Sequence, residues 1–402
     1  MLTILCVATY FKGDAFLREV KQQGCTVLLL TSDKLAGDAW PRDAIDEIHS
    51  IPRDADETRI RRTVDAVARR HRIDRITALD DFDVEMGAML REHLQVPGMG
   101  RTTASRFRDK LAMRKTAKNL GIPVPEFAPV FNDQDVNEWA ARVPPPWVLK
   151  PRSSAAAIWI KKVDSHEELW RALHAAGDQR SNRVLEHFVA GDVYHVDSIV
   201  WDNAVVFAVA FKYSRPPMQI AHEGGIFSTR RLADDSAEGS ALLGLNQRLQ
   251  DGLGLRRGLS HTEFIRAGVA GGAGGSGEFV FLETSARVGG AFIVDTIEAG
   301  TGLNLWREWA TIEVAGEHGS YSVPPYSRDH SGIVLTLARQ EEPDMSSYVD
   351  PEIKTRIRKP HHAGLIVASP DPQRVEALIA DYTERFHRDF FATAPPPERP
   401  AE

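Results

Sequence analysis

The stretch FLETSARVGG, residues 281–290, carries the most informative pattern in the chain. Alternate side chains of a β-strand lie on one face, so Glu283, Ser285 and Arg287 should line one side, with the apolar Phe281 two residues before them. Two oxygen-bearing side chains and a guanidinium on one face suit a magnesium-bound nucleotide and the charge of a phosphoryl group. The glycines that follow would let backbone N–H groups approach an anion.

A second strand-like segment, His261-Thr262-Glu263, lies shortly before this stretch. If a hairpin joins the two segments across the glycine-rich linker 267–277, Glu263 should face Glu283, and directly opposed carboxylates repel. A divalent cation between them would remove that cost, and oxygen ligands favour magnesium over zinc. A pair of salt-bridged surface glutamates is an equally open interpretation. The linker has no Lys-Ser/Thr ending, which favours a hairpin connection over a phosphate loop.

Two further segments predict a nucleotide site more weakly. Lys150 ends the apolar strand 147–150, and the small-residue loop 151–157 follows it, so an ammonium and loop amides could reach phosphate oxygens. A plain surface turn remains the favoured interpretation of that loop taken alone. Glu186 lies in the apolar strand 184–189, where it could accept a hydrogen bond from the amine of adenine. Most such glutamates are ordinary edge-strand residues.

Strand and helix signals alternate over residues 1 to about 98, which predicts a parallel sheet with crossover helices. No GxGxxG follows the first strand, so a dinucleotide site has little support. A turn at 97–100 predicts a domain boundary. One continuous helix, which carries Lys110, is expected over 103–120. Residues 214–230, rich in proline, glycine and charge, are predicted to form a loop.

Composition excludes several classes of protein. The chain has 402 residues, 43% of them hydrophobic, and a formal charge of −7, without the clustered basic face of a nucleic-acid binder. The two cysteines, Cys6 and Cys25, form no CxxC pair or metal spacing, and they read as buried reduced thiols. Residues 1–9 are apolar without a basic leader, which predicts a strand and not a signal peptide. No stretch approaches the roughly 18–20 apolar residues of a membrane span, so a cytoplasmic protein is expected.

The order of these segments is more specific than any one of them. It resembles the ATP-grasp superfamily, and more narrowly the carboxylate–amine ligases that include L-amino acid ligases and carnosine synthase. The resemblance covers about residues 1 to 390. The segments that carry it are Arg108-Asp109-Lys110, Gly121-Ile122-Pro123-Val124-Pro125, Val148-Leu149-Lys150-Pro151, Glu186-His187-Phe188-Val189, Gly191-Asp192, His261-Thr262-Glu263 and Glu283-Thr284-Ser285-Ala286-Arg287.

This resemblance implies an α/β and α+β fold: a Rossmann-like N-terminal domain with a parallel sheet, then two α+β subdomains that clamp ATP. The expected parts are an N-terminal domain (1–100), a small subdomain (101–185), a large subdomain with the Mg-ATP site (186–330), a C-terminal α+β part (331–391) and a disordered tail (392–402).

The resemblance also implies a role for each matching position. Lys110 and Lys150 would bind the nucleotide phosphates, and Arg287 would be the catalytic cation on the transferred phosphoryl group. The remaining expected ATP-binding positions are Glu186, Phe188, Val189 and Asp192. The expected ligands of Mg²⁺, or of Mn²⁺, are Glu263, Glu283 and Ser285.

Three positions depart from the family pattern. Many relatives have asparagine where this chain has Ser285, and a serine hydroxyl is shorter. The phosphate-covering loop usually contains glycine, whereas this chain has Ala155-Ala156-Ala157. Val193 stands where relatives often hold ribose with an acid, which leaves Asp192 as a substitute.

The expected activity is an ATP- and Mg-dependent ligation of small molecules. A carboxylate would be activated as an acyl phosphate and coupled to an amine, both partners being small and either one an amino acid. Neither nucleic acid nor membrane is an expected partner, and a homodimer is an open possibility. The alternatives are an ATP-grasp carboxylase, a thiol ligase, or a nucleotide-binding regulatory module without turnover.

Overall fold

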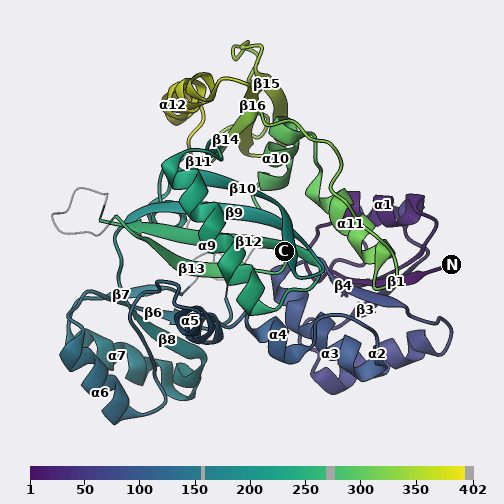
Figure 1. Cartoon of the computed structure of the whole chain (residues 1–402), viewed down its shortest axis with the longest axis horizontal. Helices are drawn as coiled ribbons and strands as arrows, with labels where there is room; N and C mark the ends of the chain where they lie inside the picture. The colour runs from purple at the N-terminus through teal and green to yellow at the C-terminus, as the bar shows by residue number, and fades with distance from the viewer. Residues whose placement is uncertain (155–158, 269–276, 394–402) are drawn as a thin grey trace.

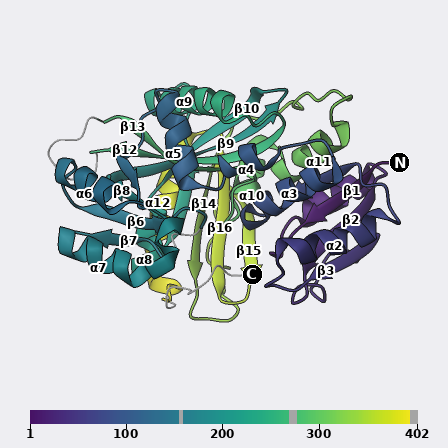
Figure 2. The same cartoon turned by 90° about the horizontal axis from the view of Figure 1, so that it is seen from below.

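The computed structural model describes residues 1–154, 159–268 and 277–393. Ala155–Ala157, most of the glycine-rich linker and the tail from residue 394 therefore lie outside the described residues. The described chain forms three β-sheets with helices packed on them (Figures 1 and 2). The predicted mixed α/β and α+β class with an N-terminal parallel sheet is confirmed.

The N-terminal domain is a four-stranded parallel sheet in the order β3-β2-β1-β4, a doubly wound arrangement. The two central strands, β1 and β2, are mainly apolar and buried because helices cover both faces of the sheet. Phe16 of α1 packs on one face, and Val64 of α2 and Met89 of α3 pack on the other. Its elements are β1 (Thr3–Val7), α1 (Asp14–Gln22), β2 (Thr26–Ser32), β3 (Glu47–Ile51), α2 (Glu57–Ala68), β4 (Arg75–Ala78) and α3 (Val84–Leu94).

The small subdomain is an antiparallel sheet in the order β5-β8-β6-β7 with two helices on one face. Trp147 and Leu185 pack against those helices. Strand alternation therefore turns Lys150 and Glu186 to the other face, which looks toward the large sheet. Its elements are β5 (Phe127–Pro129), α6 (Asp133–Arg142), β6 (Trp147–Pro151), β7 (Lys161–Val163), α7 (His166–Ala176) and β8 (Arg183–His187).

The large sheet has eight strands in the order β13-β12-β9-β10-β11-β14-β16-β15. The strands from the expected C-terminal part thus continue the sheet of the large subdomain (Figure 1). Its strands are β9 (Gly191–Trp201), β10 (Ala204–Tyr213), β11 (Phe227–Arg231), β12 (Gly258–Ala267), β13 (Phe279–Ser285), β14 (His330–Leu337), β15 (Ile353–Lys359) and β16 (His362–Ser369). Its helices are α8 (Pro217–Glu223), α9 (Ala237–Leu253), α10 (Ile293–Thr301), α11 (Leu305–Ala315) and α12 (Pro372–Asp389).

The single helix predicted over residues 103–120 is wrong. Two helices, α4 (Arg101–Ser105) and α5 (Lys110–Asn119), occupy that segment. Asp109 takes an extended backbone, and its carboxylate accepts hydrogen bonds from the N–H groups of Leu111 and Ala112, as an N-cap does. Lys110 consequently begins a helix, at the end where the backbone dipole favours anions.

A β-bulge corrects the expected face of Phe281. The β12–β13 ladder pairs Glu263 with Glu283 but Phe264 with Phe281, so one extra residue, Leu282, lies on β13. A bulge of this kind reverses the alternation. Phe281 therefore faces away from Glu283 and is fully buried against Phe264 and Tyr194, with α9 and α5 over it.

The predicted loop 214–230 is also corrected. It contains the short helix α8 and most of strand β11, which pairs with β10 and β14. Pro217 begins α8, a position where the missing N–H costs nothing. Separately, none of the helices that the structure describes is long and apolar enough to cross a membrane.

Candidate active site

The predicted metal ligands lie together on one face of the large sheet. Glu263 of β12 pairs directly with Glu283 of β13, as the hairpin prediction required, and Ser285 follows on the same face of β13. The Tyr213 hydroxyl donates to Oε1 of Glu263 at 3.0 Å. Nζ of Lys110 lies 2.8 Å from Oε2 of Glu283.

This donor set fits a hard divalent cation. Two opposed carboxylates would repel unless a cation lies between them, and all three candidate ligands are oxygens. Burial opposes ionisation of Glu283, but Lys110 and Lys150 together lower the pKa of its carboxyl to about 2. Glu283 is therefore an anion at neutral pH. Glu263, Glu283 and Ser285 would hold Mg²⁺ or Mn²⁺.

Arg287 lies just after β13, at the end of the strand that carries Glu283 and Ser285. Its Nη1 donates to the carbonyl of Val288 at 2.6 Å, and its buried Nε has no hydrogen-bond partner within the chain. Among the residues that the structure describes, no carboxylate pairs with Arg287. A partly buried guanidinium without a counter-ion is suited to an incoming phosphoryl or carboxylate group.

A buried ion triad joins the small sheet to α5. Oε2 of Glu186 lies 2.7 Å from Nζ of Lys150, and Oε1 lies 3.0 Å from Nε of Arg114. Burial lowers the pKa of Lys150 to about 8, although Glu186 opposes that shift. Burial also disfavours the charged form of Glu186, but Arg114 and Lys150 hold its pKa below the usual range. The carboxylate is thus engaged with two cations, and its contact with adenine stays a prediction.

Lys110 connects the two halves of the site. Its Nζ donates to the carbonyl of Ser154, in the loop after β6, and reaches Glu283 on the large sheet. Asp109 pairs with Arg152 of the same loop. The start of α5 therefore holds Arg152 and Ser154 next to the carboxylates, although no sequence spacing links these segments.

The connection from β8 to β9 carries the predicted adenine positions. The N–H of Phe188 donates to the carbonyl of Pro146 at 3.0 Å, and Nζ of Lys162 lies 4.9 Å from the centre of its ring. Val189 packs against an apolar cluster that includes Ile265 and Val280. That cluster occupies the face of the large sheet that carries Glu263, and it would give a purine ring an apolar platform.

Asp192 is not brought together with the other predicted residues. It pairs with Lys212 at 2.7 Å and lies opposite Arg266 in the β9–β12 ladder. Both contacts are on the α9 side of the sheet, because Tyr194, two residues later, packs in the core beneath α9. The sequence could not predict on which face of the sheet Asp192 lies, since that depends on which alternate residues of β9 point toward α9.

Sequence reasoning missed a buried His–Asp–His cluster beside the carboxylates. Asp197, fully buried on β9, accepts hydrogen bonds from Nδ1 of His195 at 2.7 Å and from Nδ1 of His261 at 2.9 Å. Burial opposes the charge of His261, but Asp197 raises its pKa to about 9. The two histidines in turn hold the pKa of Asp197 well below its usual range, against the effect of burial. The sequence signal for this cluster was a pair of polar residues, His195 and Asp197, at alternate positions of the apolar strand β9.

Gly289 permits the close packing of this cluster. A Cβ atom at Gly289 would lie 2.9 Å from Oδ1 of Asp197 and 2.7 Å from Cγ2 of Ile293. We expect Gly289→Ala to destabilise the protein by about 1–3 kcal/mol, the usual cost of overpacking, seen as a lower melting temperature by circular dichroism. Gly290→Ala is the matched control, because a Cβ there meets nothing within 4 Å. Equal melting temperatures for the two variants would contradict the packing argument.

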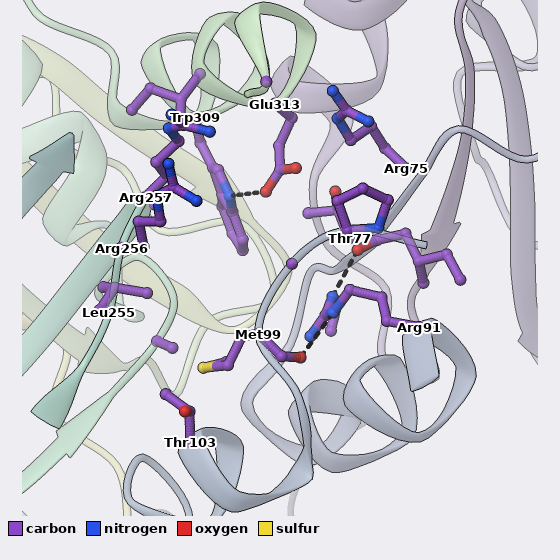
Figure 3. Close-up of a pocket in the computed structure, with 18 of the residues that line it drawn as sticks. Arg75, Thr77, Arg91, Met99, Thr103, Leu255, Arg256, Arg257, Trp309 and Glu313 are labelled. Atoms are coloured by element: carbon purple, nitrogen blue, oxygen red, sulfur yellow. Dashed lines mark hydrogen bonds between the residues drawn. The ribbon is translucent and has the colours of Figure 1, made fainter. Parts of the chain in front are cut away.

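A separate cavity of about 260 Å³ lies between β4, α3 and α11 (Figure 3). Two of its polar side chains are held by neighbours: Arg91 donates to the carbonyls of Ile76 and Met99, and Trp309 donates to Glu313. None of the predicted site residues lines it. This cavity belongs to the seam between the N-terminal domain and the large sheet.

Comparison with known proteins identifies the fold. The chain has the ATP-grasp fold, and its residues 17–98 match the family model of the ATP-grasp N-terminal domain. Over 98% of its length it superposes on 99% of an L-amino acid ligase from Bacillus licheniformis, with a TM-score of 0.73 and 16% identity. It also superposes on an N5-carboxyaminoimidazole synthetase from Staphylococcus aureus complexed with ADP, with a TM-score of 0.68 and 13% identity over 94% of this chain and 96% of the other.

The sequence relatives include an L-amino acid ligase and D-alanine–D-alanine ligases. The chain is 26% identical over 248 residues to an L-arginine-specific L-amino acid ligase of Bacillus subtilis, an alignment that covers 60% of this chain and 58% of that protein. It is 30% identical over 116 residues to a D-alanine–D-alanine ligase of Pseudomonas entomophila (strain L48), covering 28% and 36% of the two chains. The aligned part of this chain thus spans 58% or less of the length of these relatives.

Proposed function

We propose that this protein is an ATP-dependent ligase that activates a carboxylate as an acyl phosphate and couples it to an amine. The carboxylate oxygen attacks the γ-phosphorus of ATP, and ADP leaves. The amine nitrogen then attacks the acyl carbon, and the bond to the phosphate oxygen breaks. An amide, inorganic phosphate and one proton are released.

One observation carries this proposal: two opposed carboxylates and an unpaired guanidinium share one sheet face, next to two lysines. Glu263, Glu283 and Ser285 would hold Mg²⁺, and the bound ion would supply positive charge against the phosphates of ATP. Lys110 and Lys150 bind phosphate oxygens, and Arg287 stabilises the charge on the transferred group. Catalysis would then come from positioning and charge stabilisation, without a covalent protein nucleophile.

The ligase names of the relatives support an amino acid as at least one substrate. We propose that both substrates are small molecules and that the protein works in the cytoplasm, where ATP and Mg²⁺ are supplied. A homodimer would be compatible with this function and is tested by light scattering.

The decisive experiment measures Mg²⁺-dependent phosphate release from ATP with pooled amino acids and small carboxylic acids, with products read by mass spectrometry. The expected result is release that needs two pooled compounds and a product lighter than their sum by one water. A thiol ligase would give a thioester, and a carboxylase would need bicarbonate. ATP binding without release in any pool, cell extracts included, would favour a regulatory module.

The pKa of Lys150 gives a pH prediction. Above pH 8 an increasing fraction of Lys150 is a neutral amine, which cannot balance phosphate charge. We expect kcat/KM for ATP to fall above pH 8, toward a limit of about tenfold per pH unit. Lys150→Arg, whose side chain keeps its charge, should remove that decline even if its overall rate is lower. A decline that persists unchanged in Lys150→Arg would assign the titration to another group.

A further inference from the structure

The two carboxylate oxygens of Glu263 have different surroundings. Oε1 accepts the hydrogen bond of the Tyr213 hydroxyl at 3.0 Å, and Nε2 of His261 lies 3.8 Å from the same oxygen. Among the residues that the structure describes, Oε2 has no partner. The protein therefore occupies one side of this carboxylate and leaves the other oxygen open.

A hydrogen bond to Asp197 fixes the orientation of the His261 ring. Because its Nδ1 donates to Oδ1 of Asp197 at 2.9 Å, the Nε2 edge of the ring must point away from Asp197, toward Glu263. Asp197 is itself fixed by His195 at 2.7 Å, and Nε2 of His195 lies 3.0 Å from the Thr229 hydroxyl. Asp197, His195, Thr229 and His261 are each at least nine-tenths buried.

Tyr213 is held equally firmly. The residue is 4% exposed, and its ring contacts the rings of His195 and Phe227 at 4.8 and 5.7 Å between centres. The 3.8 Å separation from His261 exceeds a direct hydrogen bond, so Tyr213 supplies the bond and the imidazole limits the rotamers open to Glu263.

We propose that Tyr213 and His261, the latter aimed by Asp197, are positioning residues that fix Oε1 of Glu263 and leave Oε2 to bind the divalent cation. The inference rests on the proposed function, because it takes Glu263 as a metal ligand. Groups that orient a metal ligand typically contribute about 10–100-fold to metal affinity.

The test measures the dissociation constant of Mn²⁺ for the full chain saturated with ADP, by the electron paramagnetic resonance signal of free Mn²⁺. Tyr213→Phe removes only the hydroxyl and should raise that constant by about tenfold or more. His261→Asn should raise it as well, whereas His261→Gln, whose amide can stand near the Nε2 position, should raise it less. ADP binding without metal, measured by calorimetry, should stay within twofold of wild type.

Ser198→Ala is the matched control. Ser198 is fully buried on the same strand as Asp197 but faces α9, where it accepts a hydrogen bond from Asn246 at 2.7 Å. This variant loses a buried hydrogen bond without reaching Glu263, so its Mn²⁺ affinity should equal that of wild type.

Two outcomes would overturn the inference, and they differ in whether the proposed metal site fails as well. If Tyr213→Phe and His261→Asn bind Mn²⁺ within threefold of wild type while Glu283→Gln loses it, the metal site stands and the positioning role is wrong. If Glu283→Gln also binds Mn²⁺ normally, the metal site of the proposed function fails with it.

Discussion

Replacing Glu283 with glutamine should abolish metal-dependent turnover, a loss of at least about 10³-fold, while the protein stays folded. The substitution keeps the shape of the side chain but removes the charge that faces Glu263 and pairs with Lys110. The cation would lose an anionic ligand, and Lys110 would lose the partner that holds it beside the phosphates. The assay is Mg²⁺-dependent phosphate release, with circular dichroism to confirm folding.

Glu384→Gln on α12 is a suitable control, because this glutamate is exposed on the C-terminal helix, away from the sheet face that carries Glu283. It should retain full activity. Turnover like that of wild type in Glu283→Gln would refute the assignment of the metal site. A loss of activity accompanied by a collapse of the circular dichroism signal would instead place Glu283 in the folding of the β12–β13 hairpin.

Replacing Glu186 with glutamine should have the largest effect on stability, about 3–5 kcal/mol. The change leaves the fully buried Arg114 and the nearly buried Lys150 without their counter-ion, and each pays the cost of a buried charge. A drop in the melting temperature of about 4–6 °C is expected, measured by differential scanning calorimetry.

Two comparisons separate charge burial from other effects of this change. Glu167→Gln breaks an exposed i,i+4 pair with Arg171 in the same subdomain and should cost under about 0.5 kcal/mol. The triple variant Arg114→Met, Lys150→Met and Glu186→Leu should recover much of the stability, because apolar groups replace the whole buried ion triad. A melting temperature unchanged in Glu186→Gln would show that Arg114 and Lys150 find other compensation.

Local patterns in the sequence could predict much of the fold and the metal side of the site. Apolar strand runs and helical periodicity are set by residues that are close in the sequence. These patterns were therefore enough to predict the N-terminal parallel sheet and the β12–β13 hairpin. The pairing of Glu263 with Glu283 followed from that hairpin, since a hairpin sets its own register. The sequence analysis missed the interruption between α4 and α5. The N-cap of α5 is Asp109, and no glycine or proline marks that point in the sequence.

What the sequence by itself determined was the set of chemical groups: the carboxylates, lysines and arginine, and the strands that carry them. Only the tertiary structure decided which of them meet. Because of the bulge at Leu282, Phe281 packs in the core. The alternation of side chains along β9 places Asp192 on the face opposite Glu263. The pairing of β9 with β12 places Asp197 next to His261. Glu186 gained Arg114 from a helix 72 residues away in sequence. Such contacts depend on sheet order and packing between distant segments, which no local pattern records.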